Sequence, residues 1–168
     1  INLSDQIKIK KIKASKDTVK FKGQFARYIK TTRNSIITAL TILRERNLIS
    51  SYYSILVNKK VPVFAGMGGG TSNAVCLIKY LVRKKINKNL LSILDKTIGS
   101  DSRLFFYEQG FLKNLKTVNT FPRKYRLYFL LVYPNVRCST QYIYSKVRKY
   151  SSKSKYSFNK MNNKSKFI

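Results

Sequence analysis

The sequence has no histidine and only two cysteines, Cys76 and Cys138, among its 168 residues. Two cysteines are too few for a disulfide framework or for a four-ligand zinc site. Because histidine is absent and sulfur is scarce, we expect no transition-metal centre. This cysteine usage fits a reduced compartment, so the expected location is cytoplasmic.

Long apolar runs are also missing. The longest, such as residues 128–133, are far shorter than the roughly 20 residues that a helix needs to cross a bilayer. No membrane association is therefore expected. The chain begins at Ile1 without a charged leader followed by an apolar stretch, so no signal peptide is expected either. The missing Met suggests a longer protein cut at its N-terminus.

Acidic residues are the third scarcity, with 6 Asp and Glu against 35 Lys and Arg and a net charge of +29. Such a balance is typical of nucleic-acid binding, which usually concentrates cations on one patch. Here the cations are spread over nearly every segment, among the Lys, Asn, Ile, Tyr, Phe and Ser that A/T-rich codons encode. We therefore favour compositional bias over a nucleic-acid role. With 43% hydrophobic and 13% aromatic residues, the chain is too apolar to be wholly disordered.

Apolar periodicity predicts alternating strands and helices. The predicted strands cover about 7–12, 18–22, 53–57, 104–107 and 111–115, with a buried strand over 127–133. The predicted helices run from about 34 to 46 after a Thr31 or Thr32 cap, from 73 onward, over 90–96, and from Ser139 or Thr140 to about 149. The length suits one domain, or one domain and part of another. Residues 151–168 contain five lysines and no acid, which predicts a linker or frayed tail.

The first candidate site lies at Pro62–Ser72, which contains four glycines in five positions, 66 to 70. Glycines permit positive φ, so backbone amides can converge on one point. The following helix adds unpaired N–H groups and a positive dipole end, and together these features predict a phosphate cradle. The hydroxyls of Thr71 and Ser72 are expected to cap the helix or to contact a magnesium ion. The alternative is a flexible glycine turn before an ordinary capped helix.

Two further candidates follow in the chain. Asp101, in Gly99-Ser100-Asp101, stands at a loop where a carboxylate is able to accept or orient a hydroxyl proton during phosphoryl transfer. The alternative role is a turn or capping Asp. Thr140 and Tyr144 are four residues apart, so on a helix they share a face that suits a planar base. The alternative there is a helix cap and a core aromatic.

In this order, the three motifs resemble the GHMP kinases. Pro62–Ala74 is similar to the family's Pro-x-x-x-Gly-Leu-Gly-Gly-Gly-Ser-Ser-Asn-Ala, with Met67 for Leu and Thr71 for the first Ser. Gly99-Ser100-Asp101 is similar to its Gly-Ala/Ser-Asp, and the segment from Tyr133 to Tyr144 to its Pro, Ser-Thr and aromatic. The resemblance extends from about Leu3 to Arg148. It is greatest to members that phosphorylate 4-(cytidine 5'-diphospho)-2-C-methyl-D-erythritol in non-mevalonate isoprenoid biosynthesis.

The resemblance implies a fold, a reaction and residue roles. The fold is α+β, with a GHMP-kinase N-terminal domain (ribosomal protein S5 domain 2-like) over 1–123 and the start of a ferredoxin-like C-terminal domain over 124–150. An ATP-dependent kinase is implied, acting on the substrate's 2-hydroxyl. ATP would bind Pro62, Val63, Phe64, Ala65, Gly66, Met67, Gly68, Gly69, Gly70, Thr71 and Ser72, with Ser72 on Mg2+. Asp101 would be the catalytic base, Tyr144 would stack on the cytosine and Thr140 would lie beside it.

The family's Lys-x-Asn-Leu strand and Asp-Gly-Tyr-His motif have no counterpart here. We expect the chain to lack both motifs, the catalytic Lys and most of the C-terminal domain, and by itself to be inactive or nearly so. Two other functions remain open at this point. One is a basic, ribosome-associated nucleic-acid-binding module, and the other is a different GHMP kinase such as a mevalonate-type enzyme.

Overall fold

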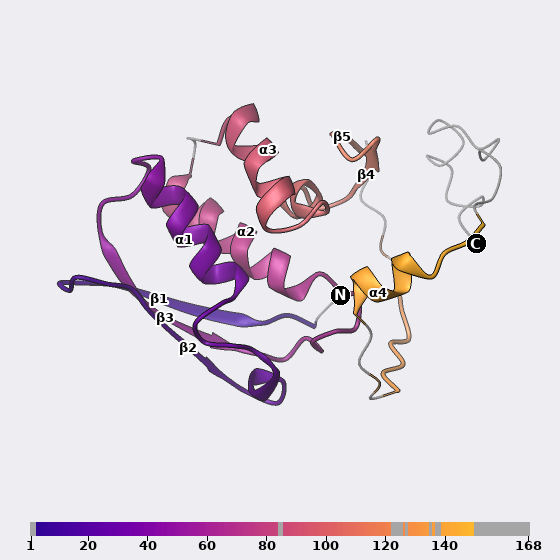
Figure 1. Cartoon of the computed structure of the whole chain (residues 1–168), viewed down its shortest axis with the longest axis horizontal. Coiled ribbons are helices and arrows are strands. Elements are labelled where there is room, and N and C mark those ends of the chain that lie inside the picture. Colours follow the sequence, from indigo (N-terminus) through magenta and orange to yellow (C-terminus); the bar gives the residue numbers. More distant parts are fainter. Residues whose placement is uncertain are drawn as a thin grey trace.

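The computed structural model of the chain describes residues 3–83, 86–121, 126, 128–134, 136 and 139–149. The predicted tail over 151–168 and Cys138 lie outside these residues. The described part mixes helices and strands, as expected (Figure 1). None of its helices has the length and apolar character that crossing a membrane requires.

A three-stranded sheet forms one layer of the fold. Its strands are β1 (Gln6–Ile12), β2 (Thr18–Lys22) and β3 (Tyr52–Asn58). The order is β1-β3-β2, with β3 antiparallel to β1 and parallel to β2. This register places Ile9 and Val19 on either side of Ile55. The predicted strands over 7–12, 18–22 and 53–57 are therefore confirmed.

Helices cover one face of this sheet (Figure 1). After the short 3-10 helix η1 (Ala26–Tyr28), α1 (Ser35–Glu45) crosses from β2 back to β3, and α2 (Gly69–Val82) and α3 (Lys88–Thr97) follow. The predicted cap of α1 was wrong. Asn34, not Thr31 or Thr32, accepts hydrogen bonds from the amides of Ile36 and Ile37, at 3.1 Å each. An N-cap must directly precede the first helical residue, and here that position holds Asn34.

The core lies between the two layers. Ile55 and Val57 of β3 pack under Leu40 and Leu43 of α1, and all four are at most 1% exposed. Leu77 and Ile78 from α2 and Leu94 from α3 complete the same cluster. One continuous core therefore holds the start of α1 and the start of α2 in fixed positions, where the candidate site lies.

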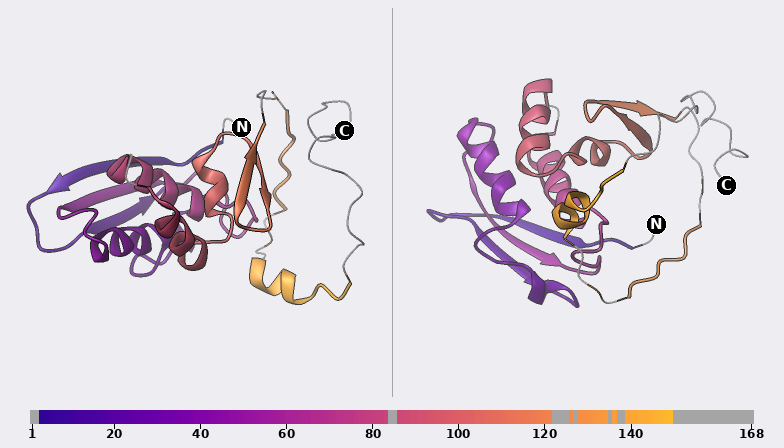
Figure 2. Two further views of the ribbon diagram at one scale, coloured as in Figure 1. Left: turned by 90° about the horizontal axis from the view of Figure 1, so that it is seen from above. Right: turned by 45° about the vertical axis from the view of Figure 1, so that its right-hand side comes forward.

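The remaining elements are η2 (Ser102–Phe106), the hairpin β4 (Gly110–Lys113) and β5 (Thr117–Thr120), and α4 (Thr140–Ser145). The hairpin forms a separate sheet, apart from β1-β3-β2 (Figure 2). The predicted strand over 104–107 was wrong because this segment turns as η2 across α2 and α3, with Ser102 bonded to the Gly99 carbonyl at 2.5 Å. β4 ends before Asn114 and Leu115, whose φ angles of 52° and 54° belong to the turn.

The apolar run near residue 130 was also interpreted wrongly. Residues 128–134 form no strand, and Tyr128 and Leu130 are 96% and 91% exposed. A strand needs a neighbour for its backbone groups, and none of the described strands pairs with this run. One packing contact to the rest of the fold is Tyr133, which meets Phe25 edge to face with ring centroids 5.7 Å apart.

Candidate active site

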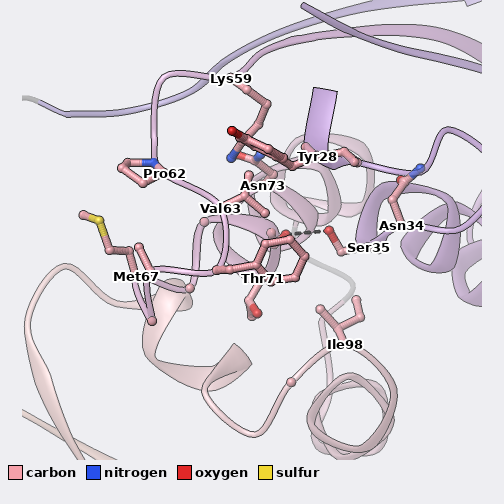
Figure 3. Close-up of a pocket in the computed structure, with 18 of the residues that line it drawn as sticks. Tyr28, Asn34, Ser35, Lys59, Pro62, Val63, Met67, Thr71, Asn73 and Ile98 are labelled. Carbon is pink, nitrogen blue, oxygen red and sulfur yellow. Dashed lines mark hydrogen bonds between the residues drawn. The ribbon is translucent and has the colours of Figure 1, made fainter. Parts of the chain in front are cut away.

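A cavity of about 810 Å³ opens beside the glycine-rich loop (Figure 3). Its walls come from the loop itself, from the segment before α1, from the start of α1 and from the loop between α3 and η2. The lining includes Tyr28, Lys30, Arg33, Asn34, Ser35, Lys59, residues 62–71, Asn73, Ile98, Gly99, Ser100, Asp101 and Tyr144. The structure thus brings together the glycine loop, Asp101 and Tyr144, whereas Ser72 and Thr140 are not among the described residues that line the cavity.

Glycines give the loop its shape at the start of α2. Gly66 and Gly68 have φ angles of 68° and 62°, which L side chains rarely adopt. Gly68 is the N-cap residue of α2, and no side chain caps this helix. The first amides of α2 therefore have no partner within the helix and begin at the cavity wall. An uncapped helix start beside a cavity is suited to an anion.

The predicted cap of α2 was wrong. The helix begins at Gly69, so Thr71 and Ser72 lie inside its first turn and cannot precede it as caps. Their hydroxyls also separate: Thr71 lines the 810 Å³ cavity, whereas Ser72 lines another cavity of about 370 Å³ together with Asp5 and Cys76. Of this pair, Thr71 is the residue that borders the main cavity.

A second helix begins at the same cavity. Asn34 and Ser35, at the start of α1, line it, and Ser35 Oγ donates a hydrogen bond to the Gly70 carbonyl at 2.7 Å (dashed in Figure 3). This bond joins the first turn of α1 to the first turn of α2. Because the positive ends of both helix dipoles meet here, the wall favours negative charge.

Asp101 lies directly beside the glycine loop. A Cβ on Gly68 would come within 2.9 Å of Asp101 Oδ2, and a Cβ on Gly99 within 2.7 Å of Asp101 Oδ1. The absent side chains at these two positions therefore let the carboxylate approach the loop. Asp101 stands before η2 but does not cap it with its side chain, so the alternative capping role is not seen. Within the described residues the only acid that lines the cavity is Asp101.

Cations around the cavity were missed by the sequence analysis. Lys30, Arg33 and Lys59 line it, against the single carboxylate of Asp101. Lys30 and Arg33 are exposed, but Lys59 is only 2% exposed. A signal for Lys59 was available: the alternation of β3 buries Ile55 and Val57, and its continuation places residue 59 on the buried face. A lysine at an inward position usually needs a partner.

Asp5 is the partner of Lys59, and the two side chains form a buried ion pair. Asp5 Oδ1 accepts the backbone amides of Lys60 and Val61 at 2.8 and 2.9 Å, and Oδ2 also accepts Asn73 Nδ2 at 2.8 Å. Burial by itself raises the pKa of Asp5. The hydrogen bonds from Lys59, Val61, Asn73 and Lys60 outweigh burial and hold the pKa below its usual value.

The proposed base-binding residues lie on the last described helix. Tyr144, on α4, lines the cavity and is 70% exposed. Thr140 is the first residue of α4, and Ser139 caps the helix by accepting the Tyr142 amide at 3.4 Å. The capping role expected of Ser139 or Thr140 thus falls to Ser139. The helix ends at Ser145, earlier than the predicted limit near 149.

Comparisons with known proteins identify relatives, although no model of a known protein family matches the chain. A 4-diphosphocytidyl-2-C-methyl-D-erythritol kinase from Pelagibacter ubique is 35% identical over 156 residues, which cover 90% of this chain and 55% of that protein. The same enzyme from a Sulfurihydrogenibium species is 31% identical over 128 residues, 72% of this chain and 46% of its own. A crystal structure of 4-(cytidine 5'-diphospho)-2C-methyl-D-erythritol kinase matches 62% of this chain and 36% of its own at 22% identity, with a TM-score of 0.43.

The relatives are kinases, and they confirm the resemblance to GHMP kinases that the motifs indicated. More particularly, the chain belongs to the family of the 4-diphosphocytidyl-2-C-methyl-D-erythritol kinases. It spans about half the length of the curated relatives that it matches.

Proposed function

We propose that this chain is the ATP-binding part of a kinase that phosphorylates the 2-hydroxyl of 4-(cytidine 5'-diphospho)-2-C-methyl-D-erythritol. The names of its relatives support the substrate, and the cavity beside the glycine loop supports the chemistry. Within this proposal residues 1–123 form the GHMP-kinase N-terminal domain, and residues 124–150 begin a ferredoxin-like domain. The pathway served is non-mevalonate isoprenoid biosynthesis.

One observation carries the proposal: the uncapped start of α2 and the Asp101 carboxylate border the same cavity. The ATP phosphates lie against residues 62–72, where the first amides of α2 donate to them. Lys30, Arg33 and Lys59 add positive charge on the cavity wall. Such a wall holds the triphosphate in place for in-line transfer.

Asp101 acts as the base in this mechanism. Its carboxylate accepts the proton of the substrate hydroxyl as the hydroxyl oxygen forms its bond to the γ-phosphorus. The bond between the γ-phosphorus and the β,γ-bridging oxygen breaks, and ADP leaves with that electron pair. No hydrogen bond or ion pair within the described part of the chain occupies the Asp101 side chain, so it is available to the incoming hydroxyl.

The donors around Asp101 also fit a magnesium ion. A Cβ on Gly99 would meet both Asp101 Oδ1, at 2.7 Å, and Thr71 Oγ1, at 3.0 Å, so a carboxylate and a hydroxyl lie near one point. Mg2+ prefers one or two carboxylates together with phosphate oxygens and water. When bound, the ion neutralises charge on the phosphates. Thr71 is better placed to hold it than Ser72, because Ser72 lines the separate smaller cavity.

The cytidine end of the substrate meets α4 in this proposal. The exposed ring of Tyr144 stacks on the cytosine. Thr140, the first residue of the same helix, is placed beside the base in this proposal. Stacking of this kind contributes about 1–3 kcal/mol per base in nucleic-acid complexes. The two alternatives from the sequence, a nucleic-acid-binding module and a mevalonate-type kinase, are not favoured, because the relatives are kinases for a cytidylyl substrate.

The test is ADP release with and without the cytidylyl substrate. The protein is this chain joined to the segments of the Pelagibacter ubique kinase that it does not match, and MgATP binding is measured on the chain itself. Asp101→Asn should lower turnover by about a thousandfold while the unfolding transition changes little. Asparagine has a similar shape but cannot take the proton.

Glu45→Gln is the matched control, because Glu45 is an exposed carboxylate at the end of α1, outside the cavity lining. It should leave turnover unchanged. Undiminished turnover in Asp101→Asn would remove Asp101 from its role. Tight binding to mixed RNA with a steep salt dependence, without ATP binding, would replace the kinase by the nucleic-acid alternative.

A further inference from the structure

Lys59 is the largest fully buried side chain of the described fold. It follows β3 directly, and its backbone amide donates to the Lys22 carbonyl at 2.7 Å, so its position is fixed by the sheet. Within the described residues, its ammonium group has one bonded acceptor, Asp5. Lysine is almost never fully buried unless it is paired. The question is therefore what the buried pair of Lys59 and Asp5 does for the residues around it.

The ammonium group lies directly behind the start of α2. A Cβ on Gly69, the first residue of the helix, would come within 3.3 Å of Lys59 Nζ and 3.1 Å of Val61 Cγ1. The backbone of the glycine loop thus packs on the lysine without an intervening side chain. In Figure 3 the Lys59 side chain runs toward Asn73, which belongs to the second turn of α2.

Asp5 connects this lysine to three other groups. Its carboxylate accepts Lys59, Asn73 of α2 and the two amides that lead into the loop, those of Lys60 and Val61. The network stands between two cavities: Lys59 lines the 810 Å³ cavity, Asp5 lines the 370 Å³ cavity, and Asn73 lines both. It therefore forms the wall that carries the glycine loop.

We propose that Lys59 is a positioning residue of the phosphate site, which holds the start of α2 in place through Asp5 and Asn73 and adds a fixed positive charge behind its amides. This inference takes its ligand, ATP, from the proposed function. The position of Lys59 behind the start of α2 does not depend on that proposal. The physical reason is that a buried ion pair fixes its partners only while both charges are present. Lys59 Nζ also lies 3.3 Å from the place that a Cβ on Gly69 would take, so the ammonium group is close to the first amides of α2.

The experiment compares Lys59→Met with Lys60→Met in the full chain. Met keeps the length of the side chain and removes the charge, and Lys60 is an exposed lysine one position further along. We expect Lys59→Met to weaken binding of MgATP and of inorganic tripolyphosphate by at least about tenfold. Amide hydrogen exchange in residues 66–72 should accelerate in Lys59→Met, whereas Lys60→Met leaves both measurements unchanged.

A double variant separates positioning from simple stabilisation. Lys59→Met leaves Asp5 buried without its cation, so lower stability alone is able to weaken binding. Asp5→Asn with Lys59→Met removes both charges and should recover much of the lost melting temperature. If Lys59 positions the site, tripolyphosphate binding stays weak in the double variant. Recovery of binding together with the melting temperature would reduce the pair to a structural role and overturn the proposal.

The experiment also distinguishes a failure of the proposed kinase function from a failure of the positioning role of Lys59. A chain that binds tripolyphosphate but not ATP contradicts the proposed function, while the comparison of Lys59→Met with Lys60→Met still tests the positioning role. If the unmodified chain binds neither ATP nor tripolyphosphate, amide hydrogen exchange alone tests whether Lys59 positions the glycine loop. Equal exchange in residues 66–72 of both lysine variants would overturn the inference.

Discussion

At the scale of single residues, scarce carboxylates are assigned to distinct tasks. Asp5, Asp17 and Asp95 each pair with one cation, respectively Lys59, Arg44 and Arg103. Asp17 also accepts the Tyr53 amide at 2.7 Å, so it fixes the start of β3. Asp101 differs from these three, because it borders the cavity without a cation bound to it. Among the acids that the structure describes, Asp101 is the one that lines the cavity, while Glu45 is exposed elsewhere, at the end of α1.

The Asp5 network predicts a stability that depends on pH. The pKa of Asp5 is lowered in the folded chain, so the unfolded chain binds more protons and stability rises with pH in this window. The contribution is complete above a pH of about 4 and disappears as the pH falls through the folded pKa. Asp5→Asn should therefore lose about 3 to 5 kcal/mol at neutral pH, and much less at acidic pH.

Urea unfolding between neutral and acidic pH measures this difference. The curves of unmodified chain and Asp5→Asn should approach each other as the pH falls. Glu45→Gln, which changes an exposed carboxylate, should follow the unmodified chain throughout. A difference in the free energy of unfolding between Asp5→Asn and the unmodified chain that stays the same at every pH would contradict the lowered pKa.

At the scale of elements, the site depends on where two helices begin. The Asn34 side chain caps the N-terminus of α1, whereas α2 has Gly68 as its N-cap residue and therefore no side-chain cap. Ser35 joins the two starts through its bond to the Gly70 carbonyl. The free amides thus belong to α2, the helix that opens from the glycine loop. This arrangement explains why glycine, and not a capping Ser or Asp, stands at position 68.

Two glycines of this loop make a matched pair of variants. Gly66 and Gly68 both have positive φ, so the backbone conformation by itself should cost an alanine about 1–2 kcal/mol of stability at either position. Only at Gly68 would the Cβ collide with neighbours, at 2.7 Å from Phe105 Cζ and 2.9 Å from Asp101 Oδ2; at Gly66 nothing lies within 4 Å.

Gly68→Ala should therefore displace Asp101 and lower phosphoryl transfer by about a hundredfold more than Gly66→Ala. Two measurements are needed. Turnover is measured on this chain joined to the unmatched segments of the Pelagibacter ubique kinase, and stability is measured by urea unfolding of each variant. Equal loss of turnover in both variants would show that backbone strain, rather than the position of Asp101, controls the reaction.

At the scale of the whole molecule, one core connects the sheet with three helices. Residues of β3, α1, α2 and α3 belong to a single buried cluster. Within the part of the chain that the structure describes, Lys59 is the one buried lysine or arginine. The other described Lys and Arg are exposed or partly exposed, and at the surface their positive charge attracts anions in general.

Because the helices and the sheet share a single core, we predict that they unfold together in one transition. Leu77→Ala, at a position that is 0% exposed, should lower the free energy of unfolding by about 2–5 kcal/mol. Leu115→Ala, at a position that is 61% exposed, should change it by less than about 0.5 kcal/mol. Fluorescence and circular dichroism should give the same midpoint in urea, and separate midpoints would show that the core is divided.

The parts of the fold that could be predicted were those with a local pattern of apolar residues in the sequence. Alternation around Ile9, Val19 and Ile55 located the three strands of the sheet, and helical spacing located α1 and α3. The interpretation failed at 104–107 and 127–133, where apolar residues are plentiful but no described strand lies alongside. A pattern of apolar residues shows that a segment is able to pack, but a strand forms only where another backbone pairs with it.

The candidate site divides in the same way. The sequence by itself determined the glycine loop, the Asp101 motif and the resemblance to the kinases, because these depend on residue types at fixed local spacing. Only the tertiary structure decided that Asp101 meets Gly68, that Thr71 rather than Ser72 borders the main cavity, and that Lys59 pairs with Asp5. Asp5 and Lys59 are 54 positions apart, and a contact over that distance is fixed by sheet register and core packing, which no local pattern specifies.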